Sequence, residues 1–140
     1  MMFRGEQIYQ LMPQRPPIVM VDVVQSLTDK SADTALTVKT DNIFVENGVL
    51  REAGMIEHIA QTAAIFAGYP AFRDGGQPRL GYIGELRKFK ITALPRLADT
   101  LVTHLDLVAE AAGVTLVKAH TCVAGNCVAE GQMKVFLKAD

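Results

Sequence analysis

The chain lacks an excess of charge of either sign. It has 14 Lys and Arg residues against 15 Asp and Glu residues, which gives a net charge of −1. No global field therefore attracts nucleic acid or an anionic membrane surface. The sequence also lacks any run near the ~20 apolar residues of a membrane-spanning helix, and its first residues are not a basic region followed by an apolar stretch. These absences exclude nucleic-acid and membrane partners and favour a cytoplasmic location.

Cysteine is scarce, with only Cys122 and Cys127. A two-residue hairpin turn at Gly125 and Asn126 would place them diagonally, too far apart for an unstrained disulfide, whereas a four-residue loop would place them opposite each other. The spacing alone does not decide, and we favour reduced thiols. The three histidines lie far apart on different predicted elements, so we predict no metal site and no cofactor.

What the chain does have is a regular pattern of strands around one helix. Its 140 residues, 49% of them hydrophobic, fit one domain over residues 1–140 with a real core. There is no internal repeat, linker or low-complexity tract. Periodicity and turn residues predict the following elements: a helical turn at 5–11, strands at 18–27, 34–40, 80–91, 100–110, 114–123 and 128–138, a helix at 52–67, and loops at 42–51 and 68–78.

One buried helix against about six antiparallel strands is an α+β arrangement with the helix on one face of the sheet. The helix is rich in Ala and Gly, which let other backbone pack closely, so we expect the sheet to wrap around it. Within this apolar helix stands Glu57. A buried carboxylate is costly unless it is paired or functional, which makes Glu57 the first candidate for general acid or base chemistry. The alternative is a helix-edge residue that is either solvated or bonded to Gln61, one turn on.

Three stretches resemble a known family when they are taken together and in order. Residues 11–22 contain Leu-Met-Pro-Gln-Arg-Pro-Pro followed by an apolar run and Val-Asp, residues 57–61 read Glu-His-Ile-Ala-Gln, and residues 89–101 contain Phe-Lys, a proline and Asp-Thr-Leu. These motifs are similar to those of the 3-hydroxyacyl-(acyl carrier protein) dehydratases. The resemblance implies the hot-dog fold, in which a long antiparallel sheet wraps a central helix, and a homodimer or higher oligomer whose sites lie at the dimer interface.

By this resemblance Glu57 is the acid that protonates or positions the leaving 3-hydroxyl group, and Gln61 holds the hydrogen bonds of the site. The family's catalytic histidine lies in the loop before the helix. Here that loop, residues 45–51, contains no histidine. The base is therefore not at its usual place.

His58 is the obvious replacement base and is included with Glu57 as a candidate catalytic residue. Adjacent helical residues point about 100° apart, so the two side chains on one helix cannot face the same carbon directly. A twofold dimer would be needed to bring His58 of one subunit near Glu57 of the other. The alternative, which we favour, is a core histidine that binds a backbone carbonyl. His104, beside Asp106, and His120 fall on polar strand faces and are not favoured as bases.

Substrate binding is assigned more broadly. The amides at the start of the helix are candidates for polarising a thioester carbonyl, with Gly48 or Gly54 permitting close approach. The alternatives for these glycines are a tight turn and a helix-packing contact. Tyr82 and Phe89, together with Met55, Ile59, Ile65 and Phe66, are candidates for lining an acyl tunnel, or else they are plain core.

Five basic residues cluster in sequence around the helix entry and a flanking strand, namely Arg51, Arg87, Lys88, Lys90 and Arg96. They suit the docking of an acidic acyl carrier protein, although strand charges are usually just a solvated face. The predicted substrate is an acyl thioester of that carrier or of coenzyme A.

We therefore predict a dehydratase that forms a trans-2-enoyl thioester in fatty-acid or polyketide-type synthesis. The alternatives are an acyl thioesterase on the same fold and a non-catalytic acyl-carrier-binding subunit.

Overall fold

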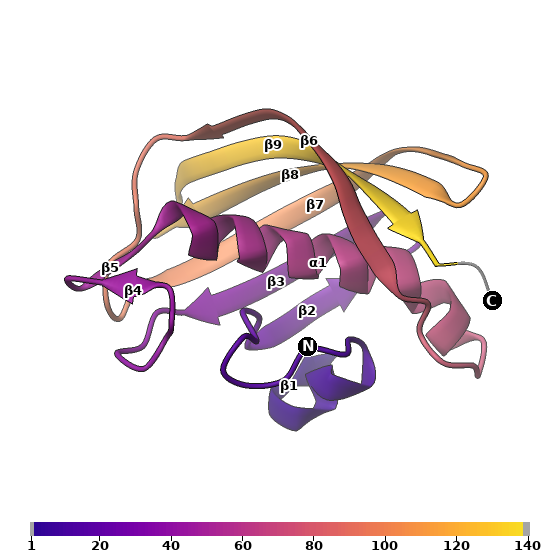
Figure 1. Cartoon of the computed structure of the whole chain (residues 1–140), viewed down its shortest axis with the longest axis horizontal. Helices are drawn as coiled ribbons and strands as arrows, with labels where there is room; N and C mark the ends of the chain where they lie inside the picture. Colours follow the sequence, from indigo (N-terminus) through magenta and orange to yellow (C-terminus); the bar gives the residue numbers. More distant parts are fainter. Residues whose placement is uncertain (1, 139–140) are drawn as a thin grey trace.

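The computed structural model describes residues 2–138 and has one long helix held by a curved antiparallel sheet (Figure 1). Seven strands form the sheet in the order β1-β2-β3-β7-β8-β9-β6, and β4 and β5 form a separate hairpin. The elements are β1 (Phe3–Arg4), the 3₁₀ helix η1 (Gly5–Gln10), β2 (Val23–Leu27), β3 (Ser31–Thr37), β4 (Val45–Glu46), β5 (Val49–Leu50), α1 (Glu52–Arg73), β6 (Gly81–Ile91), β7 (Thr100–Ala111), β8 (Val114–Val123) and β9 (Asn126–Leu137).

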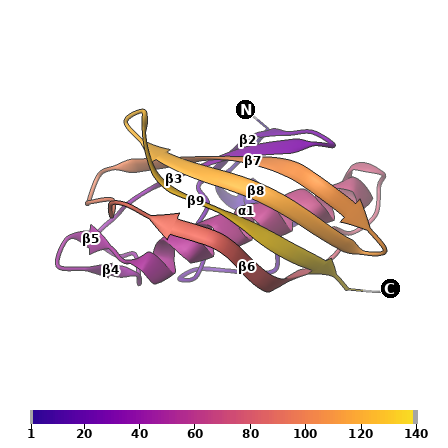
Figure 2. The same cartoon turned by 90° about the horizontal axis from the view of Figure 1, so that it is seen from above.

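The sheet wraps α1, as expected for the hot-dog fold. Seen from above, the strands β7, β8 and β9 lie across the helix (Figure 2). The inner face of the sheet and the helix share one hydrophobic core, with Met55 and Ile59 of α1 and Leu101 and Leu105 of β7 all fully buried. Gly54 lets α1 approach its neighbours, because a Cβ there would lie 2.6 Å from the Phe44 Cβ atom. The predicted α+β class is confirmed.

The helix is longer than the sequence pattern predicts. The pattern places Gly68 and Pro70 in the loop, but α1 continues to Arg73 with Pro70 inside it. Tertiary packing explains the extension: Tyr69 and Phe72 pack on Phe3, with ring centroids 6.5 and 6.1 Å from the Phe3 ring. These contacts stabilise the last turn beyond the proline.

The second strand is shorter than predicted. It begins at Val23 rather than at residue 18. The preceding backbone hydrogen-bonds to helix side chains instead of to a neighbouring strand, because Met20 N donates to Gln61 Oε1 at 2.7 Å. That segment therefore lies along α1 and contributes to the candidate site.

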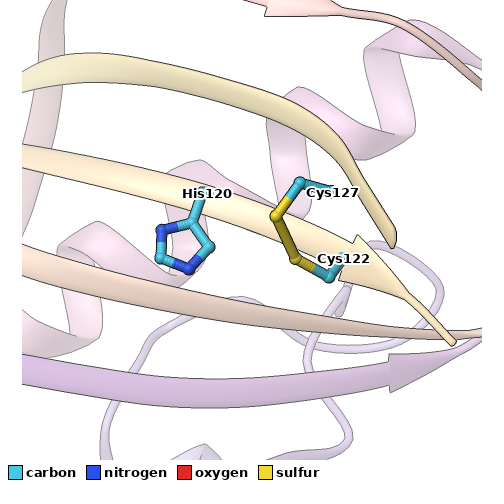
Figure 3. A group of neighbouring side chains, drawn as sticks. All are labelled: His120, Cys122 and Cys127. Carbon is cyan, nitrogen blue, oxygen red and sulfur yellow. A yellow bond between two sulfur atoms is a disulfide. The ribbon is translucent and has the colours of Figure 1, made fainter. Parts of the chain in front are cut away.

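The final hairpin turns one residue earlier than predicted. β8 ends at Val123 and β9 begins at Asn126, so the turn residues are Ala124 and Gly125, with φ of 50° and 83°. This register places Cys122 directly opposite Cys127, and the structure pairs them as a disulfide (Figure 3). The favoured prediction of reduced thiols is therefore wrong for this structure, because the turn at Ala124 and Gly125 brings the two cysteines opposite each other, which the spacing alone did not decide. Among the described residues, no helix is long and apolar enough to span a membrane.

Candidate active site

Glu57 lies on α1 and is half-buried. Its Oε2 atom accepts a hydrogen bond of 2.8 Å from Nε2 of Gln61, one turn further along the helix. The bond leaves the second carboxylate oxygen available to a ligand. The contact with Gln61 is the one expected by the alternative interpretation, in which Glu57 is a helix-edge residue.

Gln61 itself is almost fully buried, with 2% of its surface exposed. Besides its bond to Glu57, its amide nitrogen donates to Ile18 O at 2.8 Å, and its oxygen accepts from Met20 N at 2.7 Å. These backbone contacts fix the orientation of the amide. Gln61 therefore holds the Glu57 carboxylate in one position and ties the segment 18–20 to the helix.

His58 points in another direction, into the core, and is fully buried. Its Nδ1 atom lies 2.7 Å from Met20 O, and its Nε2 atom lies 2.9 Å from Thr103 Oγ1. A carbonyl oxygen only accepts hydrogen bonds, so Nδ1 carries the proton and Nε2 of the neutral ring accepts from Thr103. The Thr103 oxygen then accepts the hydroxyl of Thr121 at 2.6 Å. These contacts determine which group donates in each of the three buried hydrogen bonds.

A second chain of hydroxyls reaches the backbone of the same residue. Thr62 Oγ1 donates to the His58 carbonyl at 2.9 Å and lies 2.8 Å from Thr34 Oγ1. Thr34 must be the donor in that pair, because the Thr62 hydrogen is already used. Sequence reasoning missed these threonines as a network. A signal was present, since Thr103 alternates with Leu101 and Leu105 on the apolar face of its strand.

This geometry favours the core-histidine interpretation of His58. Burial lowers the pKa of its imidazole to about 4, against the smaller opposing effects of the Met20 hydrogen bond and the Asp22 charge. Both ring nitrogens are already engaged by Met20 and Thr103. A ring inside the core of its own subunit does not reach a substrate or a second subunit, so the structure speaks against His58 as the replacement base.

Gly48 and Gly54, the two glycines assigned to substrate binding, have structural roles. Gly48 has a φ of 76° and follows Asn47, with a φ of 52°, in the turn between β4 and β5. Gly54 packs beneath Phe44 and Leu50, and its amide donates to Arg51 O at 2.9 Å. That amide is not free to bind a thioester carbonyl. The alternatives of a tight turn and a helix-packing contact therefore fit both positions better.

Tyr82 and Phe89 do not line one tunnel. Phe89 packs against the core, with its ring over Gly131. Tyr82 is 55% exposed and pairs across strands with Phe136, which is also exposed. The two rings therefore lie on opposite faces of the sheet. The helix residues offered as tunnel lining are core residues, each at most 5% exposed: Met55, Ile59, Ile65 and Phe66.

The predicted basic cluster divides into two groups, one around the start of α1 and one on β6. In the first group, Arg51 is the N-cap of α1 and forms an ion pair of 3.3 Å with Glu52. The backbone of Arg96 pairs with that of Val49 in β5 as an isolated antiparallel β-bridge. The second group, on the edge strand β6, consists of Arg87, Lys88 and Lys90. All five are exposed to solvent.

His104 lies beside Asp106, as predicted, and also contacts Asp33. Its Nδ1 atom is 2.7 Å from Asp33 Oδ1, and its Nε2 atom is 3.0 Å from Asp106 Oδ1. The hydrogen bond to Asp33 is the main reason that the pKa of His104 is raised, with burial opposing it and Asp106 adding to it. This residue stands on the outer face of the sheet, far from Glu57.

Two cavities flank the segment that joins η1 to β2. One of about 390 Å³ is lined by residues such as Tyr9, Pro17 and Asp22, and one of about 230 Å³ is lined by residues such as Arg15, Ala64 and Arg79. Neither is lined by Glu57. Within the described residues, the strand β6 at the edge of the sheet pairs on one side only, with β9.

A curved antiparallel sheet wrapped around one long helix defines a hot-dog protein. Residues 6–140 match the sequence model of the ApeP-like family, described as ApeP dehydratase. The chain belongs to this ApeP-like dehydratase family, which confirms the predicted dehydratase kinship.

Individual proteins that resemble this chain include two dehydratases. The chain is 28% identical to the 3-hydroxyacyl-[acyl-carrier-protein] dehydratase FabZ of Ruminiclostridium cellulolyticum, over 95% of this chain and 96% of that protein. Among solved structures it resembles the dehydratase heterocomplex ApeI:P from Xenorhabdus doucetiae, with a TM-score of 0.87, 16% identity, and coverage of 95% of this chain and 91% of that one. It also resembles a hypothetical thioesterase with coenzyme A from Streptococcus pneumoniae, with a TM-score of 0.70, 10% identity, and coverage of 84% and 86%. These structures share its fold.

Proposed function

We propose that this chain is a subunit of a 3-hydroxyacyl-thioester dehydratase in which Glu57 acts on the 3-hydroxyl group. In the reaction a base removes the α-proton, the bond between C3 and the hydroxyl oxygen breaks, and the product is water and a trans-2-enoyl thioester. The observation that carries the proposal is the half-buried Glu57 carboxylate, held by Gln61 in a chain of a dehydratase family. Glu57 would supply the proton that turns the leaving hydroxyl into water.

The base is proposed to come from a second hot-dog subunit that covers the Glu57 face. The loop that carries the family's histidine has none here, and His58 is committed to the core. The unpaired edge of β6 favours pairing with another chain, because an open edge strand of eleven residues is a ready template. The second subunit is either another copy of this chain or a different dehydratase chain, by analogy with the dehydratase heterocomplex ApeI:P.

The substrate is proposed to arrive on an acyl carrier protein rather than on free coenzyme A. The exposed basic groups at the start of α1 and along β6 suit an acidic carrier, since complementary charge speeds encounter and fixes register. Reversing two of the β6 charges in one variant, Arg87→Glu with Lys90→Glu, should raise the KM for a carrier-bound substrate. The same change should leave the KM for the coenzyme A thioester unaltered.

The test is an assay that separates elimination from hydrolysis. The chain, alone and with a histidine-bearing dehydratase subunit, is incubated with 3-hydroxyacyl and saturated acyl thioesters of several chain lengths. Formation of the enoyl thioester is followed by its absorbance, and hydrolysis is followed by free thiol. Enoyl formation that needs Glu57 supports the proposal, and thiol release from both substrates would assign the chain to the thioesterases instead.

Glu57→Gln is the informative variant, because Gln preserves size but cannot donate the proton. Turnover should fall by roughly 10²–10⁴-fold with KM largely unchanged. Glu52→Gln is the matched control, since Glu52 is an exposed carboxylate on the first turn of the same helix. A Glu57→Gln variant with wild-type elimination would remove Glu57 from the mechanism.

A further inference from the structure

Three side chains with metal-ligating atoms meet on the outer face of the sheet, away from α1. They are His120 and Cys122 of β8 and Cys127 of β9, and their nitrogen and sulfur atoms all lie within 4.8 Å of one another. Figure 3 shows the imidazole next to the sulfur pair, with the helix behind the strands. None of the three takes part in the proposed dehydration.

The strand register explains why these residues share a face. His120 and Cys122 are two residues apart on β8 and so point to the same side. On β9 the register shifts between the pair Thr121 with Ala129 and the pair Cys122 with Cys127. The Ala124–Gly125 turn places Cys127 directly opposite Cys122, on the outer side with His120, and the bulge follows beyond this pair. The fold thus collects two sulfurs and one nitrogen from two adjacent strands.

The geometry points to a metal site that forms when the disulfide is reduced: we propose that His120, Cys122 and Cys127 bind a thiophilic divalent ion, with Zn²⁺ as the best match. In tetrahedral zinc sites the metal lies about 2.3 Å from sulfur and 2.0–2.1 Å from nitrogen, so the ligand atoms are roughly 3.5–3.8 Å apart. The ligand atoms, which lie within 4.8 Å of one another, are close to this spacing, and the two sulfurs can separate once their bond is reduced.

The site is gated by the oxidation state of the two cysteines. In the disulfide form the sulfurs are bonded to each other and do not act as thiolate ligands. Reduction by a dithiol consumes two electrons and two protons, breaks the bond between the sulfurs and yields two thiols, while the dithiol becomes a disulfide. Binding of the ion then displaces one proton from each thiol. Metal affinity therefore reports the redox state of this hairpin.

Three protein ligands leave the fourth position of a tetrahedral ion open. A groove of about 460 Å³ adjoins this position and is lined by residues that include His120, Cys127 and Glu130. Glu130 is the cross-strand partner of His120, so its carboxylate is on the same side of the sheet. Water or a small anionic ligand has access to the open position from this groove.

The experiment uses the full chain, reduced with a phosphine that is then removed, and titrated with Co²⁺ without oxygen. We expect one equivalent to bind, with the visible bands of tetrahedral cobalt and a near-ultraviolet thiolate-to-cobalt band, and Zn²⁺ to displace it. His120→Ala should weaken binding at least about tenfold, and the double variant Cys122→Ser with Cys127→Ser should abolish it. The oxidised protein should bind no cobalt at this site.

His104→Ala is the matched control, because its ring lies beside that of His120, with centroids 5.5 Å apart, and is held by Asp33 and Asp106. It should bind cobalt as the wild type does. Protection of the two thiols from alkylation by Zn²⁺ gives a readout on the wild-type chain, independent of how any variant folds. Absence of protection, unchanged affinity in His120→Ala, or equal loss in His104→Ala would each overturn the proposal.

Discussion

The imidazole of His58 donates its Nδ1 hydrogen to the carbonyl oxygen of Met20, 2.7 Å away, and so joins the central helix to the segment that precedes β2. Gln61 makes the neighbouring bonds from the next turn of α1, to Ile18 and Met20. Glu57 is held through Gln61. The candidate catalytic carboxylate is thus positioned by a buried polar network that has its own measurable stability.

The first prediction concerns the pH dependence of stability. Burial lowers the pKa of His58 to about 4, so its imidazole stays neutral in the folded chain between pH 6.5 and 4. In the unfolded chain the same imidazole takes up a proton near its ordinary pKa of 6.5. The unfolded state then binds more protons between these values, and the unfolding free energy should fall by about 3 kcal/mol as pH drops from 6.5 to 4. Urea unfolding at a series of pH values measures this loss.

His58→Gln separates this effect from other titrating groups. Its amide can donate to Met20 and accept from Thr103, but it does not titrate. The variant should be less stable at pH 7, because its fit in the core is poorer, and its stability should change less between pH 6.5 and 4. A variant with the same pH slope as the wild type would contradict the assignment.

The second prediction concerns Gln61. Gln61→Glu preserves the shape but places a second carboxyl beside Glu57, at a contact of 2.8 Å in the native chain. Two carboxyls that close cannot both ionise easily, so the pair should hold one proton to higher pH. Because Glu57 acts in its protonated form, the alkaline limb of the pH–rate profile of dehydration should shift to higher pH. Gln61→Leu should instead lower stability by about 1–3 kcal/mol, since it leaves the buried amide of Met20 unpaired.

The sequence predicted the fold well because its signals were local. Alternation along β7 and β8 and the Ala-rich pattern of α1 follow from neighbouring residues alone. The errors arose where contacts between residues far apart in the sequence set the bounds of an element. Packing on Phe3 extends α1 past Pro70, and the backbone of Met20 hydrogen-bonds to the Gln61 side chain instead of to a neighbouring strand. Within the candidate site, Glu57 stood out as a carboxylate in an apolar helix, and the role of Gln61 followed from the family resemblance. The inward direction of His58 and its link to Thr103 depend on how the helix sits in the sheet, which spacing does not give.

The third prediction concerns His104, whose pKa is raised chiefly by its hydrogen bond to Asp33. Both ring nitrogens face carboxylates, and both can donate only when the ring is charged. Stability from this group is complete below the unfolded pKa of about 6.5 and is lost as pH rises through the higher folded value. The side chain is 35% exposed, so the contribution should be about 1 kcal/mol or less.

Proton NMR titration of the His104 ring gives the test. Asp33→Asn should bring its pKa down toward the ordinary value, and Asp106→Asn should have the smaller effect of the two. A wild-type ring that titrates at or below 6.5 would show that the two carboxylates do not stabilise its charged form.

The last prediction concerns turn chemistry. The hairpin turns at Ala112–Gly113 and Ala124–Gly125 have positive φ at both residues, as does Asn47–Gly48. This pattern is the type I′ turn, which favours Asn or Gly at its first position, whereas alanine in the left-handed region costs roughly 1–2 kcal/mol. Ala112→Asn should therefore stabilise the chain by about 0.5–1 kcal/mol, measured by urea unfolding. Asn47→Ala is the reciprocal control and should destabilise by a similar amount, since it brings the same strain into an equivalent turn. A gain in Ala112→Asn without a matching loss in Asn47→Ala would mean that the asparagine acts through contacts beyond its backbone conformation.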